Sequence, residues 1–350
     1  MKVLITGAAG FIGFHLMRRL AERGISTFGI DNFDDYYDIN LKYARLREIG
    51  ITHELSDGKI LQSTIYDRCT FLALDIVNLH ELKTLFANHK FTHVVNLAAQ
   101  AGIRYSLKNP HAYIQSNVVG FMNVLECCRN NAIKHLVYAS SSSVYGNTDN
   151  VPFSENNDTN TPLSIYAVTK RSNELMAYTY SHLYNLPTTG LRFFTVYGPW
   201  GRPDMAPMLF ANAISNGGTI KVFNDGDMER DFTYIDDIIQ GIERVIYNDP
   251  MNADNNAKHE IYNIGNSCPI KLMDFIQGLE AEMGSTALKK FMPMQSGEAK
   301  VTYADTSKLV KAIGYSPNTK LNDGLKHFVD WYKDYYTSNK RDNASLKTVV

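Results

Sequence analysis

The sequence has few cysteines, no long apolar run and no excess of charge of one sign. Its four cysteines form no C-x-x-C pair, which excludes a disulfide framework and the common zinc motifs and favours a reducing, cytoplasmic setting. No segment reaches the roughly 18 consecutive apolar residues of a membrane span. The 35 Lys+Arg and 36 Asp+Glu give a net charge of −1, too small to attract nucleic acid or a membrane surface. We therefore expect partners that are neither nucleic acids nor membranes.

Short β-branched segments alternate with longer helical patterns over the first 140 residues. This order is typical of βαβ units that build a parallel sheet. Ile12, Leu16 and Leu20 recur at the spacing of a helix that packs on such a sheet. We predict an α/β fold with a doubly wound parallel sheet of the Rossmann type. Its strands are expected at residues 2–6, 27–30, 70–74, 93–97 and 135–140, with a further helix over 117–128.

The length of 350 residues suggests about two domains. Residues 33–68 are too long for an ordinary connection and hold apolar residues at near-helical spacing, so we expect an insertion with its own helix. The alternation of strands and helices is lost from residue 195 onward. We predict a first domain over 1–194, a smaller C-terminal α/β lobe over 195–338 with some segments returning to the first domain, and a tail over 339–350.

The turn after the first strand carries three glycines, Gly7, Gly10 and Gly13, before a helix. Glycines at this spacing let the backbone approach a pyrophosphate, whose charge then lies at the helix N-terminus. An ordinary tight turn between strand and helix is the alternative interpretation.

Two carboxylates follow the next strands. Asp31 lies 18 residues beyond Gly13, where it could accept hydrogen bonds from the adenosine ribose hydroxyls of a dinucleotide. A 2′-phosphate beside Asp31 would be repelled, and no basic residue stands at 32 or 33, so NAD is favoured over NADP. Asp75 follows the third strand, near the expected adenine. Each carboxylate could instead be a helix N-cap.

Tyr166 and Lys170 are four residues apart in a helical stretch and so lie on one helix face. A nearby ammonium would favour the phenolate of the tyrosine and make it a general base. A run of four serines at 140–143 ends the fifth strand, where ligands bind in doubly wound folds. One of these hydroxyls could relay a proton to Tyr166. A surface Tyr/Lys pair and a serine-rich turn are the structural alternatives.

Together these motifs resemble the extended branch of the short-chain dehydrogenase/reductase superfamily, of the NAD-dependent nucleotide-sugar epimerase/dehydratase kind. The likeness covers nearly the whole chain. Two segments, AAQAGIRYSLKNP at 98–110 and RFFTVYGPWGRPDMA at 192–206, are similar to the UDP-glucuronate 4-epimerases. The other matching segments are GAAGFIG at 7–13, DNF at 31–33, NLAAQAG at 96–102, SSSSVYG at 140–146, YAVTK at 166–170 and RDFTYIDDI at 230–238.

The resemblance implies Tyr166 as the catalytic base, Lys170 as its partner and Ser141 as the hydroxyl that bridges sugar and tyrosine. It implies that Arg202 and Thr195 hold a sugar carboxylate. Arg230 would hold the UDP phosphates, and Val222 and Phe223 would pack on uracil; the chain departs from the family pattern at Gln295 and residues 296–298, where uridine contacts stay open. Further implied cofactor contacts are Phe11, Ile12, Asn32, Ile76, Leu97, Ala98, Ala99, Ser140 and Phe193, and further substrate contacts are Arg104, Ser142 and Ser143.

The activity implied by the resemblance is interconversion of UDP-glucuronate and UDP-galacturonate at C4 through a transient 4-keto sugar, with tightly bound, recycled NAD. Alternatives are a 4-epimerase for neutral or N-acetylated sugars and a UDP-glucuronate decarboxylase. A non-catalytic NAD-binding sensor or scaffold is the alternative outside enzymes. The family also leads us to expect a homodimer formed through helices near 115–130 and 166–183.

Overall fold

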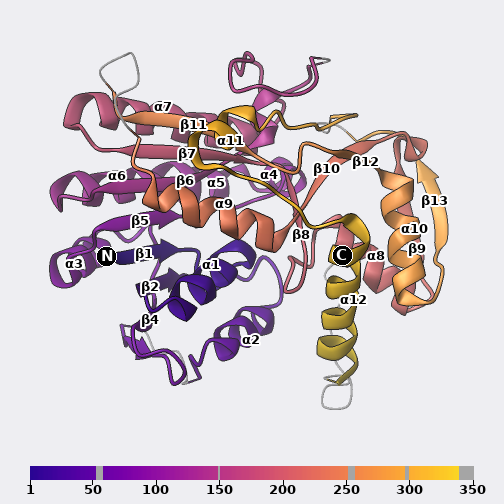
Figure 1. Cartoon of the computed structure of the whole chain (residues 1–350), viewed down its shortest axis with the longest axis horizontal. Coiled ribbons are helices and arrows are strands. Elements are labelled where there is room, and N and C mark those ends of the chain that lie inside the picture. The colour runs from indigo at the N-terminus through magenta and orange to yellow at the C-terminus, as the bar shows by residue number, and fades with distance from the viewer. Residues whose placement is uncertain (53–57, 149, 251–256, 296–298, 339–350) are drawn as a thin grey trace.

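The computed structural model describes residues 1–52, 58–148, 150–250, 257–295 and 299–338. An eight-stranded sheet with helices on both faces forms the larger part, and a smaller lobe lies at its side (Figure 1). The strand order is β11-β7-β6-β5-β1-β2-β4-β3, parallel throughout except where β3 meets β4. The strands are β1 (Lys2–Thr6), β2 (Ser26–Asp31), β3 (Leu61–Gln62), β4 (Cys69–Ala73), β5 (His93–Asn96), β6 (His135–Ser141), β7 (Thr188–Phe193) and β11 (His259–Ile264).

The predicted fold class is confirmed, and the five predicted strands are found with ends that differ by at most one residue. The order of strands reverses between β1 and β5, so the loops that follow these two strands diverge. Such a switch point opens a crevice at the carboxyl ends of the strands, and ligands bind there in doubly wound folds.

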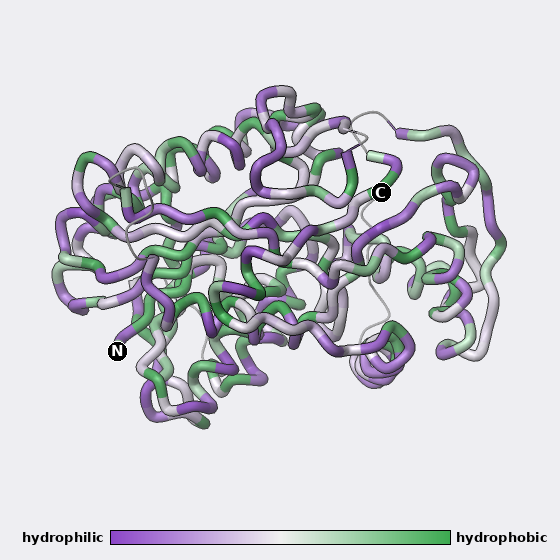
Figure 2. Tube along the Cα trace, turned by 45° about the horizontal axis from the view of Figure 1, so that its top comes forward, coloured by the Kyte–Doolittle hydropathy of each residue, from purple (hydrophilic) through white to green (hydrophobic). Residues whose placement is uncertain are grey.

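Alternate side chains of the central strands supply two cores. Val3 and Ile5 of β1 pack with α1 and α9, whereas Leu4 packs on the opposite face with α3 and α6. Figure 2 shows the hydrophobic stretches gathered in the interior of the larger part. The helices are α1 (Phe11–Glu22), α3 (Leu79–His89), α6 (Phe121–Asn130), α7 (Ile165–Tyr184) and α9 (Ile235–Tyr247).

Two further helices were predicted, one in the insertion and one over 117–128. The expected helix of the insertion is confirmed as α2 (Asn40–Glu48). The expected helix over 117–128 is also found, but its first part is a π-helix, η1 (Ile114–Gly120), that continues into α6. Short helices α4 (Ile103–Lys108) and α5 (Pro110–Tyr113) lead into it, and a 3₁₀ turn, η2 (Ser142–Tyr145), follows β6.

The smaller lobe combines two short sheets, β12-β10-β8 and β13-β9, with helices around them. Although β11 and α9 come late in the sequence, β11 extends the main sheet and α9 packs against α1. The predicted tail at 339–350 lies outside the described residues, and none of the described helices is long and apolar enough to cross a membrane. The lobe contains β8 (Thr195–Tyr197), α8 (Ala206–Ser215), β9 (Thr219–Phe223), η3 (Asn224–Gly226), β10 (Glu229–Tyr234), β12 (Pro269–Lys271), α10 (Leu272–Met283), β13 (Leu288–Met292), α11 (Ser307–Ile313) and α12 (Leu321–Ser338).

Candidate active site

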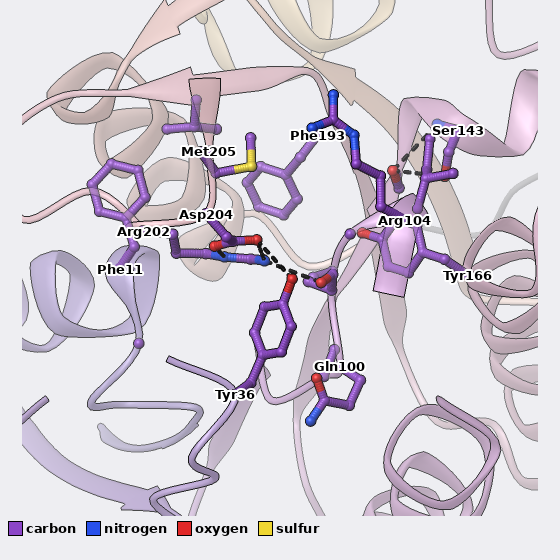
Figure 3. A pocket seen from close by; sticks show the side chains of 18 of the residues that line it. Phe11, Tyr36, Gln100, Arg104, Ser143, Tyr166, Phe193, Arg202, Asp204 and Met205 are labelled. Carbon is purple, nitrogen blue, oxygen red and sulfur yellow. Dashed lines mark hydrogen bonds and ion pairs between the residues drawn. The ribbon is translucent and has the colours of Figure 1, made fainter. Parts of the chain in front are cut away.

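A cavity of about 1330 Å³ opens at the carboxyl ends of β1, β5 and β6. Its walls come from the main sheet, from the insertion after β2 and from the smaller lobe. Sites for one drug-sized ligand usually measure about 300–1,000 Å³, so this cavity has room for a dinucleotide and a second ligand. All of the predicted site residues except Val222 line it, and Figure 3 shows several of them around the cavity.

The glycine turn leaves space where a side chain would block it. Gly7 has a φ of +69°, and a Cβ on it would lie 2.8 Å from the amide nitrogen of Ala98. A Cβ on Gly10 would lie 2.9 Å from the Gly7 carbonyl oxygen. The helix α1 then begins at Phe11 with no side-chain cap and no acidic residue in its first turn. Its N-terminus therefore fits a pyrophosphate, as NAD would supply.

The carboxylate of Asp31 is buried at the end of β2 and already has three partners. It accepts from the backbone amides of Ala9 (3.2 Å) and Phe33 (3.0 Å) and from the Lys42 ammonium (3.1 Å). Asp31 is therefore not a helix cap. Lys42 lies on α2, and no short motif links it to Asp31, so the sequence did not reveal this ion pair. The Lys42 charge also weakens the repulsion that Asp31 alone would exert on a 2′-phosphate.

Asp75 and Asn32 form a second polar contact at the same end of the cavity. The Asn32 side-chain amide donates to Asp75 at 2.9 Å, and the other carboxylate oxygen of Asp75 accepts from the backbone amide of Val77. Helix α3 is capped by Asn78, whose side chain accepts from Glu81, so the alternative of Asp75 as its N-cap is wrong. Both residues line the cavity, with Ile76 beside them.

Tyr166 and Lys170 lie on the first turns of α7, whose N-cap is Ser164. The Lys170 ammonium donates to the carbonyl of Ala139 at 2.8 Å, and burial lowers its pKa to about 8. Burial raises the pKa of Tyr166, while a hydrogen bond with Ser141 lowers it. Tyr166, Lys170 and Ser141 therefore line the cavity together, and the spacing of four had predicted that the tyrosine and the lysine share a helix face. The surface Tyr/Lys alternative is wrong, because Lys170 is buried.

The four serines at 140–143 differ in their hydrogen-bond partners. The Ser141 hydroxyl accepts from the Ser143 hydroxyl at 2.9 Å, and Ser141, Ser142 and Ser143 all line the cavity. The hydroxyl of Ser140 instead donates to the carboxylate of Glu174 at 2.6 Å and is buried. Ser140 therefore faces the cavity chiefly with its backbone, which limits its predicted cofactor contact.

The far end of the cavity holds the residues predicted to bind substrate. Arg104 lies over the ring of Phe223 with 5.1 Å between guanidinium and ring centre, and Thr195 also lines this end. Arg230 lines it too and donates to the carbonyls of Glu229 and Lys300. Gln295 reaches the cavity, whereas residues 296–298 lie outside the described residues.

The prediction of Val222 as a uracil contact is wrong. Val222 is fully buried in the core and does not line the cavity. It lies on β9 between Lys221 and Phe223, which both line the cavity. Successive side chains of a strand point to opposite faces, so Val222 faces the core.

Arg202 projects into the cavity, but its guanidinium is already paired. Its Nε and Nη2 donate to the two carboxylate oxygens of Asp204 at 3.0 and 2.6 Å, and Tyr36 donates to the same carboxylate at 3.2 Å (Figure 3). Arg202 therefore lines the cavity and at the same time forms an ion pair with Asp204. Neither Asp204 nor Tyr36 was predicted as a site residue, although Asp204 lies in the segment 192–206 that carries the resemblance.

Asn117 is a further residue that sequence reasoning missed. It lies in the π-helix η1, and its side chain accepts from the Gln100 amide at 2.8 Å and donates to the Gln100 carbonyl and the Thr169 hydroxyl. It thus ties the loop after β5 to α7, one residue from Lys170. Single π-helical turns are frequent at functional sites. The only signal in the sequence would have been a polar residue inside an apolar helix.

The model of the NAD dependent epimerase/dehydratase family matches residues 3–265 of this chain. The chain belongs to this family. Among the residues that the structure describes, no group of three or more His, Cys, Asp or Glu side chains could hold a metal ion.

Individual relatives and one solved structure are similar to this chain over nearly its whole length. "Protein CapI" of Staphylococcus aureus is 48% identical, with 96% of this chain and 99% of that protein covered. "UDP-glucuronate 4-epimerase 4" of Arabidopsis thaliana is 43% identical, with 98% and 78% covered. The crystal structure of UDP-glucuronic acid 4-epimerase from Bacillus cereus, in complex with UDP-glucuronic acid and NAD, matches with a TM-score of 0.85 and 34% identity over 96% of this chain and all of that one.

Proposed function

We propose that this protein is an NAD-dependent 4-epimerase that interconverts UDP-glucuronate and UDP-galacturonate. The observation that carries the proposal is that Tyr166, Ser141, Lys170 and Arg202 line one cavity with the glycine turn. A proton acceptor, its hydroxyl relay and a cation suited to a carboxylate are thus available to one ligand. The named 4-epimerases among its relatives support the same substrate.

The C4 hydrogen of a glycoside is not acidic, so inversion by direct deprotonation is excluded and transient oxidation is the accessible route. When bound, NAD supplies reversible hydride acceptance. Tyr166 would take the proton of the C4 hydroxyl, with Ser141 relaying it and Lys170 favouring the phenolate. After the sugar has turned, the hydride would return to the opposite face of C4 while Tyr166 gives the proton back to the C4 oxygen.

A uronic acid adds a hazard to this chemistry. Its 4-keto form is a β-keto acid, which loses carbon dioxide when the C5–C6 bond aligns with the carbonyl π system. Arg202 and Thr195 line the cavity where they could hold the carboxylate out of that alignment. The same cavity wall would thereby distinguish an epimerase from a decarboxylase.

We also propose a homodimer and a cytoplasmic location. Helix α7 exposes Ile165, Val168, Leu175 and Leu183, and the adjoining η1 exposes Ile114 and Val119. An apolar face of this kind is typical of an isologous interface. All four cysteines are free, as in a reducing compartment.

Incubation of the purified protein with UDP-glucuronate and no added NAD, followed by NMR of the sugar, tests the function. We expect UDP-galacturonate to accumulate, because the cofactor is recycled and stays bound. Tyr166→Phe should retain NAD but lose about 10²–10⁴-fold in kcat, whereas Tyr178→Phe, an exposed tyrosine on the same helix, should turn over normally. UDP-pentose or no product from the unaltered protein would refute the proposal.

A further inference from the structure

The guanidinium of Arg202 is fixed along one edge by the protein itself. Its Nε and Nη2 donate to the two oxygens of Asp204, and Nη2 also donates to the Ala101 carbonyl at 3.0 Å. Within the described residues, Nη1 is thus the nitrogen left without a protein partner. The donors of Nε and Nη2 are already used, so a sugar carboxylate could accept hydrogen bonds from Nη1 but could not form a bidentate pair with the guanidinium.

Asp204 is itself held in place by the insertion after β2. The Tyr36 hydroxyl donates to the Asp204 oxygen that accepts from Nη2, and the Tyr36 ring packs against Tyr105 with 4.7 Å between centres. Arg202 lies 5.9 Å from the centre of the Tyr36 ring. Burial raises the pKa of Tyr36 to about 12, so its hydroxyl remains a donor at neutral pH. Asp204 thus has a fixed orientation.

The same loop links this network to the reacting tyrosine. Ala101, which accepts from Arg202, also accepts from the Tyr113 hydroxyl, and Gly102 accepts from Tyr113 at 2.7 Å. The Tyr113 ring lies 6.0 Å from that of Tyr166. Nη1 of Arg202 is therefore held at a set position relative to the base, which decides where a carboxylate can lie while C4 reacts.

We propose that Asp204 and Tyr36 are positioning residues that restrict Arg202 to a one-nitrogen contact with the substrate carboxylate. Asp204 also offsets the Arg202 charge, so the pair orients an anionic sugar without clamping it. The proposal rests on the proposed function, because it assigns the means by which a uronate is turned over without loss of its carboxyl group. A sugar that must turn between two half-reactions benefits from such a contact.

Removal of the Asp204 charge should change the fate of the 4-keto sugar. A freed guanidinium could grip the carboxylate with two nitrogens and rotate it. Decarboxylation then breaks the C5–C6 bond, its electron pair forms an enolate across C4 and C5, and C5 takes a proton as carbon dioxide leaves. Return of the hydride taken at C4 gives a UDP-pentose, so no external reductant or oxidant is needed.

The test compares Asp204→Asn, Tyr36→Phe and, as a matched control, Asp35→Asn, which alters an exposed carboxylate of the same insertion. UDP-glucuronate is supplied, and kcat, KM and the ratio of UDP-pentose to UDP-galacturonate are measured. For Asp204→Asn we expect kcat to fall by about tenfold to a hundredfold, with KM unchanged or lower because the site becomes more positive. The pentose share should rise, and to a smaller extent in Tyr36→Phe.

A product ratio is independent of the folded fraction, so a purely structural ion pair would leave it unchanged. The proposal is overturned if both variants give the product ratio of the unaltered protein, or if Asp204→Asn raises KM with the ratio constant. If Asp204→Asn forms no product, the ratio in Tyr36→Phe decides alone. An unaltered protein that converts no UDP-glucuronate would refute the proposed function as well, which separates the two failures.

Discussion

Lys170 is a cation in a place that disfavours its charge. It is buried on α7, and its ammonium donates to the Ala139 carbonyl. Desolvation lowers its pKa to about 8, against 10.5 for a free lysine. Its charged form, which under the proposed function would support the Tyr166 phenolate, is therefore present at neutral pH and is lost as the pH rises through about 8.

The pH dependence of kcat/KM should show this loss. Above pH 8 we expect kcat/KM to fall about tenfold for each pH unit, because the protonated fraction of Lys170 falls by that factor. Initial rates on UDP-glucuronate between pH 6 and 10 measure it, with NAD retention followed over the same range as a control for unfolding. A profile that stays flat to pH 10 would show that the Lys170 charge is not required.

Where the sequence alone predicted geometry, the residues concerned are closely spaced. Gly7, Gly10 and Gly13 span one turn, and Tyr166 and Lys170 span one turn of a helix, so geometry follows from residue number. The residues it missed act across the chain. Lys42 reaches Asp31 from another element, and Tyr36 reaches Asp204 over 168 positions, a distance that no local pattern encodes.

At the scale of elements, helix α2 joins the insertion to the rest of the site. Arg45 on this helix is fully buried and donates to the carbonyls of Ala9 in the glycine turn and of Trp200 before Arg202. It also donates to the Tyr37 hydroxyl at 2.8 Å. One planar guanidinium thus fixes the glycine turn and the segment that leads to Arg202 relative to each other.

Arg45→Lys should break some of these hydrogen bonds while keeping the positive charge. A single ammonium cannot reach Ala9 and Trp200 together, and each buried acceptor left unpaired costs about 1–3 kcal/mol. We expect the free energy of unfolding to fall by about 2–4 kcal/mol and bound NAD to be released more readily. Urea unfolding measures the change, with Arg47→Lys, exposed on the same helix, as the control. If the two variants had equal free energies of unfolding, Arg45 would not link the two segments as described.

Helices and strands were predicted where the hydrophobic periodicity is strong, and they were missed where tertiary contacts determine the backbone conformation. Central strands such as β1 and β6 are buried on both faces and bounded by turns, so their ends were found within a residue. The π-helix η1 was not predicted; its Asn117 bonds to Gln100 and Thr169, which lie on other elements, and such contacts cannot be inferred from local propensity.

The whole molecule presents an apolar face beyond what its own sheet requires. Helix α7 covers the sheet with Ala177 and related residues, yet on its other side Leu175 is 53% exposed and Leu183 is 60% exposed. Val119 of η1 continues this face. The face lies away from the cavity wall formed by Lys170 on the same helix, so a second copy could pack there without blocking ligand entry.

Leu175→Glu should break the proposed dimer. In an isologous interface each copy would bury the new carboxylate in apolar surroundings, which its partner cannot neutralise, so association should weaken while the fold and bound NAD are kept. Analytical ultracentrifugation should give twice the chain mass for the unaltered protein and the chain mass for Leu175→Glu. Leu288→Glu, on β13 where Leu288 is 71% exposed, should stay dimeric and so control for the added charge. A dimer that survives Leu175→Glu would place the interface elsewhere.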